Sequence, residues 1–207
     1  LVRQANRAAF ADDPALVWGW YEWRRLKVLG VQPNPAHRAI AALSGRIANT
    51  RLVTQNVDDL HERAGSRDVL HLHGSLHAPR CATCAAAYRD ALPDSVEPEE
   101  GRRIEPPRCP ACGGQVRPGV VWFGEALPEA ALREAFAAAC ECDLLLSVGT
   151  SGVVQPAARI PGLALEHGAS VVHVNPQPVR TRHPREHCLV GPAGEVLPEL
   201  LRRAFPG

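Results

Sequence analysis

The chain has 207 residues, of which 45% are hydrophobic and 22% are charged, and its formal net charge is +1. This composition is typical of a globular protein with one core of ordinary size and a small additional module. It argues against a disordered chain, and no apolar run is long enough to cross a bilayer. The nearly neutral charge gives no indication of a nucleic-acid-binding face.

The first predicted element is a helix from Pro14 to about Leu29. Asp13 is suited to cap its start, Pro14 to occupy its first turn, and Gly30 to end it. A second helix is expected after the proline-containing segment 33–35.

Further along the chain, short apolar strands alternate with helices. Strands are expected at residues 51–54, 68–73, 143–148, 170–174 and 188–190. Helices are expected at residues 57–64, 128–140, 153–167 and 195–205. Nearly continuous Leu and Val strands of this kind are typical of a parallel sheet that is buried on both faces. We therefore predict an α/β, Rossmann-like fold, with helices on both faces of a parallel sheet.

Four cysteines between the second and third predicted strands form two C-x-x-C pairs, Cys81 with Cys84 and Cys109 with Cys112. This spacing is typical of a tetrahedral zinc site, and four thiolates leave no open position for water or substrate. The surrounding segment, residues 78–118, has few large apolar side chains and would need a metal to fold. Disulfides or free thiols are the alternative. We predict a structural zinc-ribbon module inserted into the α/β domain.

The remaining cysteines, Cys140, Cys142 and Cys188, show no comparable spacing, and we expect them to be buried apolar residues. The first 30 residues do not have the basic head and apolar block of a secretion signal. Together these features favour a reducing compartment, and we predict a cytoplasmic location.

Polar or small residues follow three of the predicted strands. Gln55, Asn56 and Asp58 follow the first, residues 149–152 follow the leucine-rich strand, and residues 175–177 follow the next. In open α/β sheets ligands bind beyond the carboxyl ends of the strands, and a small-residue turn at a helix start suits a phosphate. Each turn alone is more often simple helix capping. Three such turns in one sheet favour a nucleotide.

In this order the motifs resemble the sirtuins, a family of NAD-dependent protein-lysine deacylases, over essentially the whole chain. Residues 54–58 are similar to their nicotinamide and ribose motif, His73-Gly74 to their catalytic pair, and residues 121–125 to their substrate-peptide strand. The resemblance implies that His73 is the base that activates a ribose hydroxyl, which suits an imidazole because it titrates near neutral pH. Without the resemblance, the favoured interpretation of His73 is a histidine that merely caps backbone groups at a strand end.

The resemblance also implies a set of binding residues and two cofactors, NAD and structural Zn²⁺. The residues expected to bind NAD are Gln55, Asn56, Val57, Asp58, Gly149, Thr150, Ser151, Asn175, Pro176, Gln177 and Ala193. Those expected to bind the substrate peptide are Val121, Trp122, Phe123 and Gly124. By the same analogy Asn56 positions water or ribose, and Asp58 holds the nicotinamide carboxamide.

Tyr21 and Arg24 interrupt the apolar stripe of the first helix. This pair resembles the Tyr-x-x-Arg pair of class III sirtuins, which binds the distal carboxylate of succinyl-, malonyl- or glutaryl-lysine. Arginine can bind a carboxylate through two parallel hydrogen bonds, and a tyrosine hydroxyl can add a third. The alternatives are that Arg24 extends outward like Arg25, or pairs with an acid of the protein. Trp20 and Trp23 are expected to pack in the interior.

The family's first strand and its Gly-Ala-Gly loop are not found in this sequence, and we expect them upstream of Leu1 in an N-terminally truncated chain. The predicted domains are a helical segment that contributes to the acyl pocket (1–40), a Rossmann-like NAD-binding domain (41–77 and 119–207) and the zinc module (78–118).

The predicted function is NAD-dependent removal of acyl groups from protein or peptide lysines, with succinyl, malonyl or glutaryl preferred over acetyl. The products would be nicotinamide and O-acyl-ADP-ribose, and no direct contact with nucleic acid or membrane is expected. The alternatives are mono-ADP-ribosyl transfer, a non-catalytic relative, a zinc-dependent binding module and a zinc hydrolase. Four thiolates argue against a hydrolytic zinc.

Overall fold

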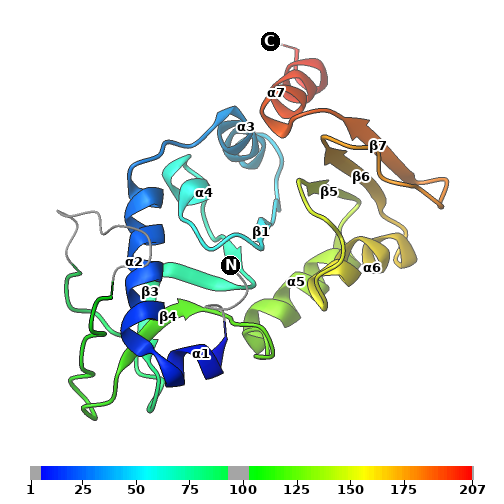
Figure 1. Ribbon diagram of the computed structural model, residues 1–207. Helices are drawn as coiled ribbons and strands as arrows, with labels where there is room; N and C mark the ends of the chain where they lie inside the picture. The colour runs from blue at the N-terminus through cyan, green and yellow to red at the C-terminus, as the bar shows by residue number, and fades with distance from the viewer. Residues whose placement is uncertain (1–5, 93–102, 207) are drawn as a thin grey trace. The chain divides into compact units, whose positions relative to one another are not determined.

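The structure is a computed structural model and describes residues 6–92 and 103–206. These residues form two compact units (Figure 1). Unit 1 consists of the described parts of Leu1–Gln32, Asn56–Asp59 and His73–Pro128, and unit 2 of those of Pro33–Gln55, Leu60–Leu72 and Glu129–Gly207. Within the described ranges no helix is long and apolar enough to span a membrane.

Unit 2 is built on parallel strands. β5 (Leu144–Val148), β6 (Ser170–Asn175) and β7 (Glu186–Val190) form a sheet in that order. β1 (Val53–Thr54) and β2 (Leu70–His71) form a second, separate parallel pair. Among the described residues the predicted sheet is therefore hydrogen-bonded as two pieces, but its parallel character is confirmed.

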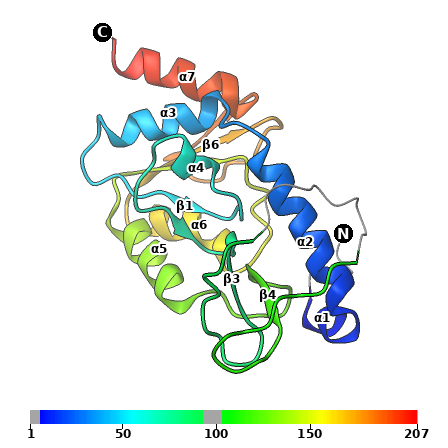
Figure 2. The same ribbon diagram turned by 90° about the vertical axis from the view of Figure 1, so that its left-hand side faces the viewer.

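Helices cover both faces of the three-stranded sheet. α3 (Pro35–Ser44) and α7 (Ala193–Ala204) pack together on one face, and α5 (Glu129–Glu141) and α6 (Ile160–Glu166) on the other (Figure 2). The alternation of side chains along β6 explains this, because neighbouring residues of a strand point to opposite faces. Val174 contributes to the core with α3 and α7, whereas Val171 contributes to the core with α5 and α6. The Rossmann-like prediction is confirmed in this unit.

Two predicted helices of unit 2 are shorter than expected. The helix expected at residues 57–64 is reduced to α4 (Leu60–Arg63). The helix expected from residue 153 begins only with the 3₁₀ turn η1 (Ala157–Arg159), which leads into α6. Gly152 has a φ of 66°, outside the helical range, and Pro156 has no N–H to donate. The expectation that the turn at residues 149–152 leads directly into a helix is therefore wrong.

Unit 1 combines two helices with an antiparallel strand pair. α1 (Arg7–Asp12) precedes α2 (Pro14–Leu29), and β3 (Gly74–Cys81) pairs with β4 (Val116–Val120). α2 has the predicted bounds, and the Asp13 side chain accepts a hydrogen bond of 3.1 Å from the N–H of Leu16. The β3–β4 pair was not predicted.

The core of unit 1 lies between α2 and the two strands. Its buried members are Phe10, Val17, Trp20, Tyr21, Leu76, Val120 and Trp122. Trp20 packs inside, as predicted, and Trp23 packs against the same cluster. Arg25 does not extend outward as expected. It is 5% exposed and its Nη2 lies 3.0 Å from the Glu22 carboxylate.

β3 and β4 approach each other so closely that two glycines are required at their contact. Gly74 has a φ of 73°, and a Cβ at this position would lie 2.1 Å from the carbonyl oxygen of Gly119. A Cβ on Gly119 would lie 1.8 Å from the carbonyl oxygen of Ala78. Because these neighbours are backbone atoms, neither can move without displacing a strand.

Gly119→Ala should therefore destabilise the chain by about 3 kcal/mol, as an overpacked core does. Chemical denaturation of both proteins would measure this difference. Gly162→Ala is the matched control, because Gly162 lies in α6 with no atom within 4 Å of its added Cβ. We expect the control to be neutral or to stabilise the chain by up to about 1 kcal/mol. Equal effects of the two substitutions would contradict the close approach.

Candidate active site and zinc centre

The four cysteines of unit 1 converge on one point. The Sγ atoms of Cys81 and Cys112 are 3.5 Å apart and those of Cys84 and Cys109 are 3.7 Å apart. All four sulfurs lie within 4.8 Å of one another, and none of the cysteines forms a disulfide. Four sulfurs at about 2.3 Å from one Zn²⁺, at the corners of a tetrahedron, would be about 3.8 Å apart. The donor set and its geometry fit a structural zinc ion.

Backbone N–H groups point at the first sulfur of this cluster. The N–H groups of Cys84 and Thr83 lie 3.4 Å and 3.3 Å from the Sγ of Cys81. These hydrogen bonds, the one from Cys84 first, lower the pKa of the Cys81 thiol to about 6 despite the opposing effect of its burial. The loop therefore stabilises a thiolate, which is the form that binds a metal.

The two C-x-x-C pairs share two features of their backbone conformation. In each pair the N–H of the first cysteine donates a 2.8 Å hydrogen bond to the carbonyl five residues later, Ala86 in one and Gly114 in the other. The residue after the second cysteine is left-handed in both, with φ of 60° at Ala85 and 73° at Gly113. Glycine adopts this left-handed conformation without strain at position 113, whereas Ala85 adopts it at a cost in free energy.

Ala85→Gly should accordingly stabilise the zinc module. A non-glycine residue in the left-handed region costs about 1 to 2 kcal/mol, and the added freedom of glycine in the unfolded chain offsets about half of this gain. We expect a net stabilisation of about 0.5 to 1 kcal/mol, measured as resistance of the zinc-loaded protein to denaturant. Ala86→Gly, one residue further on, is the control and should be neutral or destabilising. The same sign for both variants would argue against strain at Ala85.

In unit 2 the residues predicted at the strand ends come together. The Gln55 side-chain amide lies 3.4 Å from Thr150 Oγ1, and the Asn175 Nδ2 lies 3.4 Å from the Thr150 carbonyl oxygen. The N–H of Gly149 donates to the carbonyl of Val174 at 2.9 Å. Gln55 follows β1, Thr150 comes shortly after β5, and Asn175 ends β6. β5 and β6 are parallel, so their carboxyl ends lie at one edge of the sheet.

The same edge offers exposed backbone and open space. Gly149 and Ser151 are exposed, and a Cβ added to Gly149 would meet no atom within 4 Å. The N–H of Gly191 donates to the carbonyl of Asn175 at 2.9 Å, shortly before Ala193 begins α7. Pro176 and Gln177 are exposed beside them. Amide side chains around an open, glycine-containing turn fit the hydroxyl and phosphate groups of a nucleotide.

Other predicted site residues lie in unit 1. The carbonyl of His73, at the start of β3, accepts a 2.8 Å hydrogen bond from the N–H of Val121. The carbonyl of Val57 accepts a 2.8 Å bond from Leu76, so the segment containing Asn56 and Asp58 lies along the same strand. In unit 1, backbone hydrogen bonds thus connect His73 to the segment after β4, and the strand that follows His73 to the Asn56–Asp59 segment.

Tyr21 and Arg24 occupy neighbouring positions on α2. Tyr21 is 3% exposed, and its hydroxyl accepts a 3.0 Å hydrogen bond from the indole N–H of Trp122. Burial raises the pKa of Tyr21, so the phenol stays protonated. The half-buried Arg24 guanidinium lies 4.9 Å from the Trp20 ring centroid and 5.6 Å from that of Tyr21. Among the described residues no carboxylate forms an ion pair with Arg24.

Residues 121–125 do not form the strand that the resemblance suggested. β4 ends at Val120, and the N–H of Glu125 donates to the carbonyl of Trp122 at 3.0 Å to close a turn. Gly124 has a φ of 84°, which a strand does not accommodate. Within this turn Trp122 is 3% exposed, whereas Phe123 is 66% exposed and Val121 is half-buried. The indole therefore belongs to the core, and Phe123 is the side chain presented to solvent.

A buried ion pair, not predicted from the sequence, holds this turn in place. Arg117 donates to both carboxylate oxygens of Glu125, at 2.5 Å and 2.9 Å, and its guanidinium carbon lies 3.4 Å from the Trp122 ring centroid. Burial alone would raise the pKa of Glu125, but hydrogen bonds from Arg117 and from the N–H of Trp122 outweigh it and lower the pKa. The signal that could have indicated this pair is a charged residue within each of two apolar stretches.

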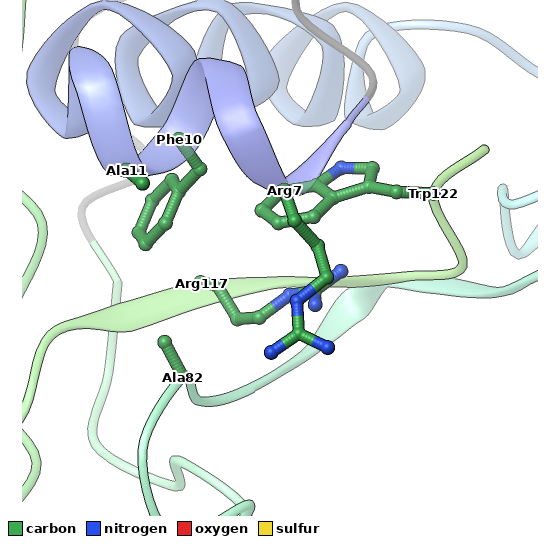
Figure 3. Close-up of a pocket in the computed structure, with 6 residues that line it drawn as sticks. All are labelled: Arg7, Phe10, Ala11, Ala82, Arg117 and Trp122. Atoms are coloured by element: carbon green, nitrogen blue, oxygen red, sulfur yellow. The ribbon is translucent and has the colours of Figure 1, made fainter. Parts of the chain in front are cut away.

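A hollow of about 160 Å³ lies beside Arg117 and Trp122 (Figure 3). Its lining consists of Arg7, Phe10, Ala11, Ala82, Arg117 and Trp122. Arg117 already donates to Glu125 and to the carbonyls of Pro118 and Val120, and the Arg7 side chain is 77% exposed. The hollow therefore lacks the convergent polar groups of a catalytic site.

Comparison with known proteins identifies the family. The family model described as "Sir2 family" matches residues 3–156, which is more than half of the chain. This chain belongs to the Sir2 family. It is 99% identical over 203 residues to "NAD-dependent protein deacylase 1" of Pseudomonas aeruginosa, a match that covers 98% of this chain and 81% of that protein. It is 57% identical to "NAD-dependent protein deacylase" of Methylococcus capsulatus, covering 98% of this chain and 80% of that protein.

Solved structures of Sir2 proteins share the fold. The crystal structure of a Sir2 homolog–NAD complex is 44% identical, with a TM-score of 0.83, and the match covers 98% of this chain and 76% of that one. The structure of Sir2Tm bound to a propionylated peptide is 27% identical, with a TM-score of 0.80, over 98% of this chain and 84% of that one. The predicted family and fold class are confirmed.

Proposed function

We propose that this Sir2-family chain removes acyl groups from protein lysines in a reaction that depends on NAD, and that it prefers acyl groups with a distal carboxylate. The deacylase activity is supported by the nearly identical P. aeruginosa relative that bears that name. The observation that carries the acyl preference is the half-buried Arg24, which stands beside Tyr21 without a carboxylate partner among the described residues.

For the cofactor, we assign the amide and hydroxyl groups at the strand ends of unit 2. Thr150 with Gln55 and Asn175, together with the exposed backbone at Gly149 and Ser151, would hold the adenosine half of NAD. Residues 176–177 and Ala193 border this group. When bound, NAD would supply the ribose: nicotinamide departs from one of its carbons, and one of its hydroxyl groups accepts the acyl group.

In unit 1 we assign the residues that act on the ribose. Asn56 positions water or a ribose hydroxyl, Asp58 holds the nicotinamide carboxamide, and Val57 packs against the core behind them. His73 removes the proton from a ribose hydroxyl, so that this oxygen can accept the acyl group. The backbone hydrogen bond between His73 and Val121 ties the base to the turn that carries Phe123 and Gly124, which we assign to the substrate peptide.

For the acyl group, the physical basis of the preference is that Arg24 and Tyr21 both offer hydrogen-bond donors. The Arg24 guanidinium is charged and half-buried, and its partial removal from water costs free energy that its contacts with the Trp20 and Tyr21 rings offset only in part. A succinyl or glutaryl carboxylate would supply that anion and accept from both Arg24 and Tyr21. An acetyl group has no such acceptor.

The other assignments follow the same proposal. Cys81, Cys84, Cys109 and Cys112 would hold a zinc ion that is structural, because four thiolates complete its coordination. We also propose the domain boundaries at residues 40, 77 and 118, and a cytoplasmic location, in which thiols remain reduced.

Replacement of His73 by Tyr should abolish turnover of every acyl substrate by the full-length protein, because the base is lost. The assay follows deacylated peptide and O-acyl-ADP-ribose by mass spectrometry, with and without NAD. His77→Tyr is the matched control, since His77 lies on β3, shortly after His73, and is half-buried like His73. The His77→Tyr variant should remain folded and active. Normal turnover by the His73 variant would show that this residue takes no part in the mechanism. If ADP-ribosylated protein were the main product, the reaction would be mono-ADP-ribosyl transfer and not deacylation.

Arg24→Met should lower kcat/KM for a succinyl-lysine peptide at least about 100-fold, since a charge-assisted hydrogen-bonded pair is lost. Acetyl-lysine turnover should change little. Lys27→Met, which removes another cation from α2, should leave the succinyl-to-acetyl ratio as it is. Equal losses for both substrates in the Arg24 variant would contradict the carboxylate-binding role.

A further inference from the structure

The Tyr21 hydroxyl has a defined direction in this structure. A phenol has one proton to donate and lone pairs to accept, whereas an indole N–H can only donate. The 3.0 Å hydrogen bond between Trp122 Nε1 and Tyr21 Oη must therefore run from Trp122 to Tyr21. The Tyr21 oxygen is the acceptor in this bond, and its own proton points elsewhere.

The Tyr21 proton has no acceptor in the part of the chain that the structure describes. Among the described residues, the bond from Trp122 is the only hydrogen bond of the Tyr21 hydroxyl. The side chain is buried, and a buried hydroxyl proton without an acceptor costs free energy. A ligand that accepts at this point recovers that cost, whereas a ligand that donates meets a second donor.

Trp122 cannot easily turn its indole away. The N–H of its backbone donates to Glu125 at 2.9 Å, and its ring lies against the Arg117 guanidinium, which in turn is bound to Glu125 through both carboxylate oxygens. Backbone and ring of Trp122 are thus held by the same ion pair. The direction of the indole N–H is fixed by contacts that do not involve Tyr21.

We propose that Trp122 is a positioning residue for acyl specificity: its indole N–H forces the Tyr21 hydroxyl to act as a donor, so that Tyr21 and Arg24 present only donors to the distal end of the acyl group. The ligand class that fits is a lysine acylated with a dicarboxylic acid. This inference rests on the proposed acyl-binding role of Tyr21 and Arg24, and goes beyond it by naming what orients Tyr21.

The discriminating ligand is a carboxamide of the same size. A succinyl group and its terminal amide, succinamyl, have nearly the same shape, but the amide end carries two N–H donors. In the wild type these donors would face the donors of Tyr21 and Arg24. In Trp122→Phe the Tyr21 oxygen loses its donor and can accept from the amide, while the phenyl ring keeps contact with Arg117.

The experiment compares kcat/KM of the full-length protein for succinyl-, succinamyl- and butyryl-lysine peptides with NAD. We expect the wild type to prefer succinyl over succinamyl, and Trp122→Phe to lower this ratio about tenfold, the effect of reorienting one buried hydrogen bond. Butyryl has neither charge nor donor and reports the loss of packing alone. An unchanged succinyl-to-succinamyl ratio in Trp122→Phe would overturn the proposal.

Trp20→Phe is the matched control. This substitution also removes an indole, and the Trp20 ring centroid lies 4.7 Å from that of Tyr21 in the same core cluster. It donates no hydrogen bond to Tyr21 in the structure. We expect this variant to keep the succinyl-to-succinamyl ratio, even if its turnover falls, and a drop equal to that of Trp122→Phe would reduce the role of Trp122 to packing.

Two further variants separate this proposal from the function on which it rests. In a Tyr21→Phe background, Trp122→Phe should have no additional effect on the ratio, because Trp122 acts through Tyr21. If Trp122→Phe does not fold, Tyr21→Phe alone must lower the ratio, and failure to do so overturns the proposal. If Arg24→Met loses the succinyl preference while Trp122→Phe keeps it, the proposed function stands and only the role of Trp122 is lost.

Discussion

The buried Arg117–Glu125 ion pair is the interaction on which the site in unit 1 depends. Removing two charges from water is costly, and such a pair repays this cost only when its remaining donors and acceptors are satisfied. Here Arg117 also donates to carbonyls of its own strand end, and Glu125 accepts from the N–H of Trp122. The pair therefore fixes the direction of the chain as it leaves β4. The turn, the indole and the backbone contact with His73 all follow from that direction.

Unit 2 reaches its candidate site by a different route. Its polar residues are not held by buried charges but by the ends of parallel strands, which coincide because helices pack on both faces of the sheet. The amide of Gln55 and that of Asn175 meet Thr150 from separate strands. Side chains at such an edge can vary in role without changing the sheet, since the backbone alone sets their proximity.

The features that could be predicted are those with a local physical signal. α2 was bounded correctly because Asp13, Pro14 and Gly30 each act within one helical turn, and the parallel strands were found from their Leu and Val runs. The cysteine cluster followed from spacing alone. The family resemblance was confirmed, whereas the roles of the individual site residues remain predictions.

The features that could not be predicted depend on pairing between distant residues. β3 and β4 contain Pro79 and Pro118, which weaken a strand pattern, and their register is set by the close approach at Gly119. The helix expected from residue 153 was delayed by Gly152. The partner of Arg117 is Glu125, across a turn whose conformation no short pattern specifies. Pairing of this kind becomes visible only when the strands are in place.

β3 connects the cysteine cluster with the candidate base. His73 immediately precedes this strand, and Cys81 ends it, about 25 Å away at the usual rise of a strand. The strand thus has the cysteine cluster at one end and the candidate base at the other. A zinc ion that takes no part in the chemistry would still hold the His73 imidazole in position, so a chelator would inhibit this enzyme without binding where the substrate binds.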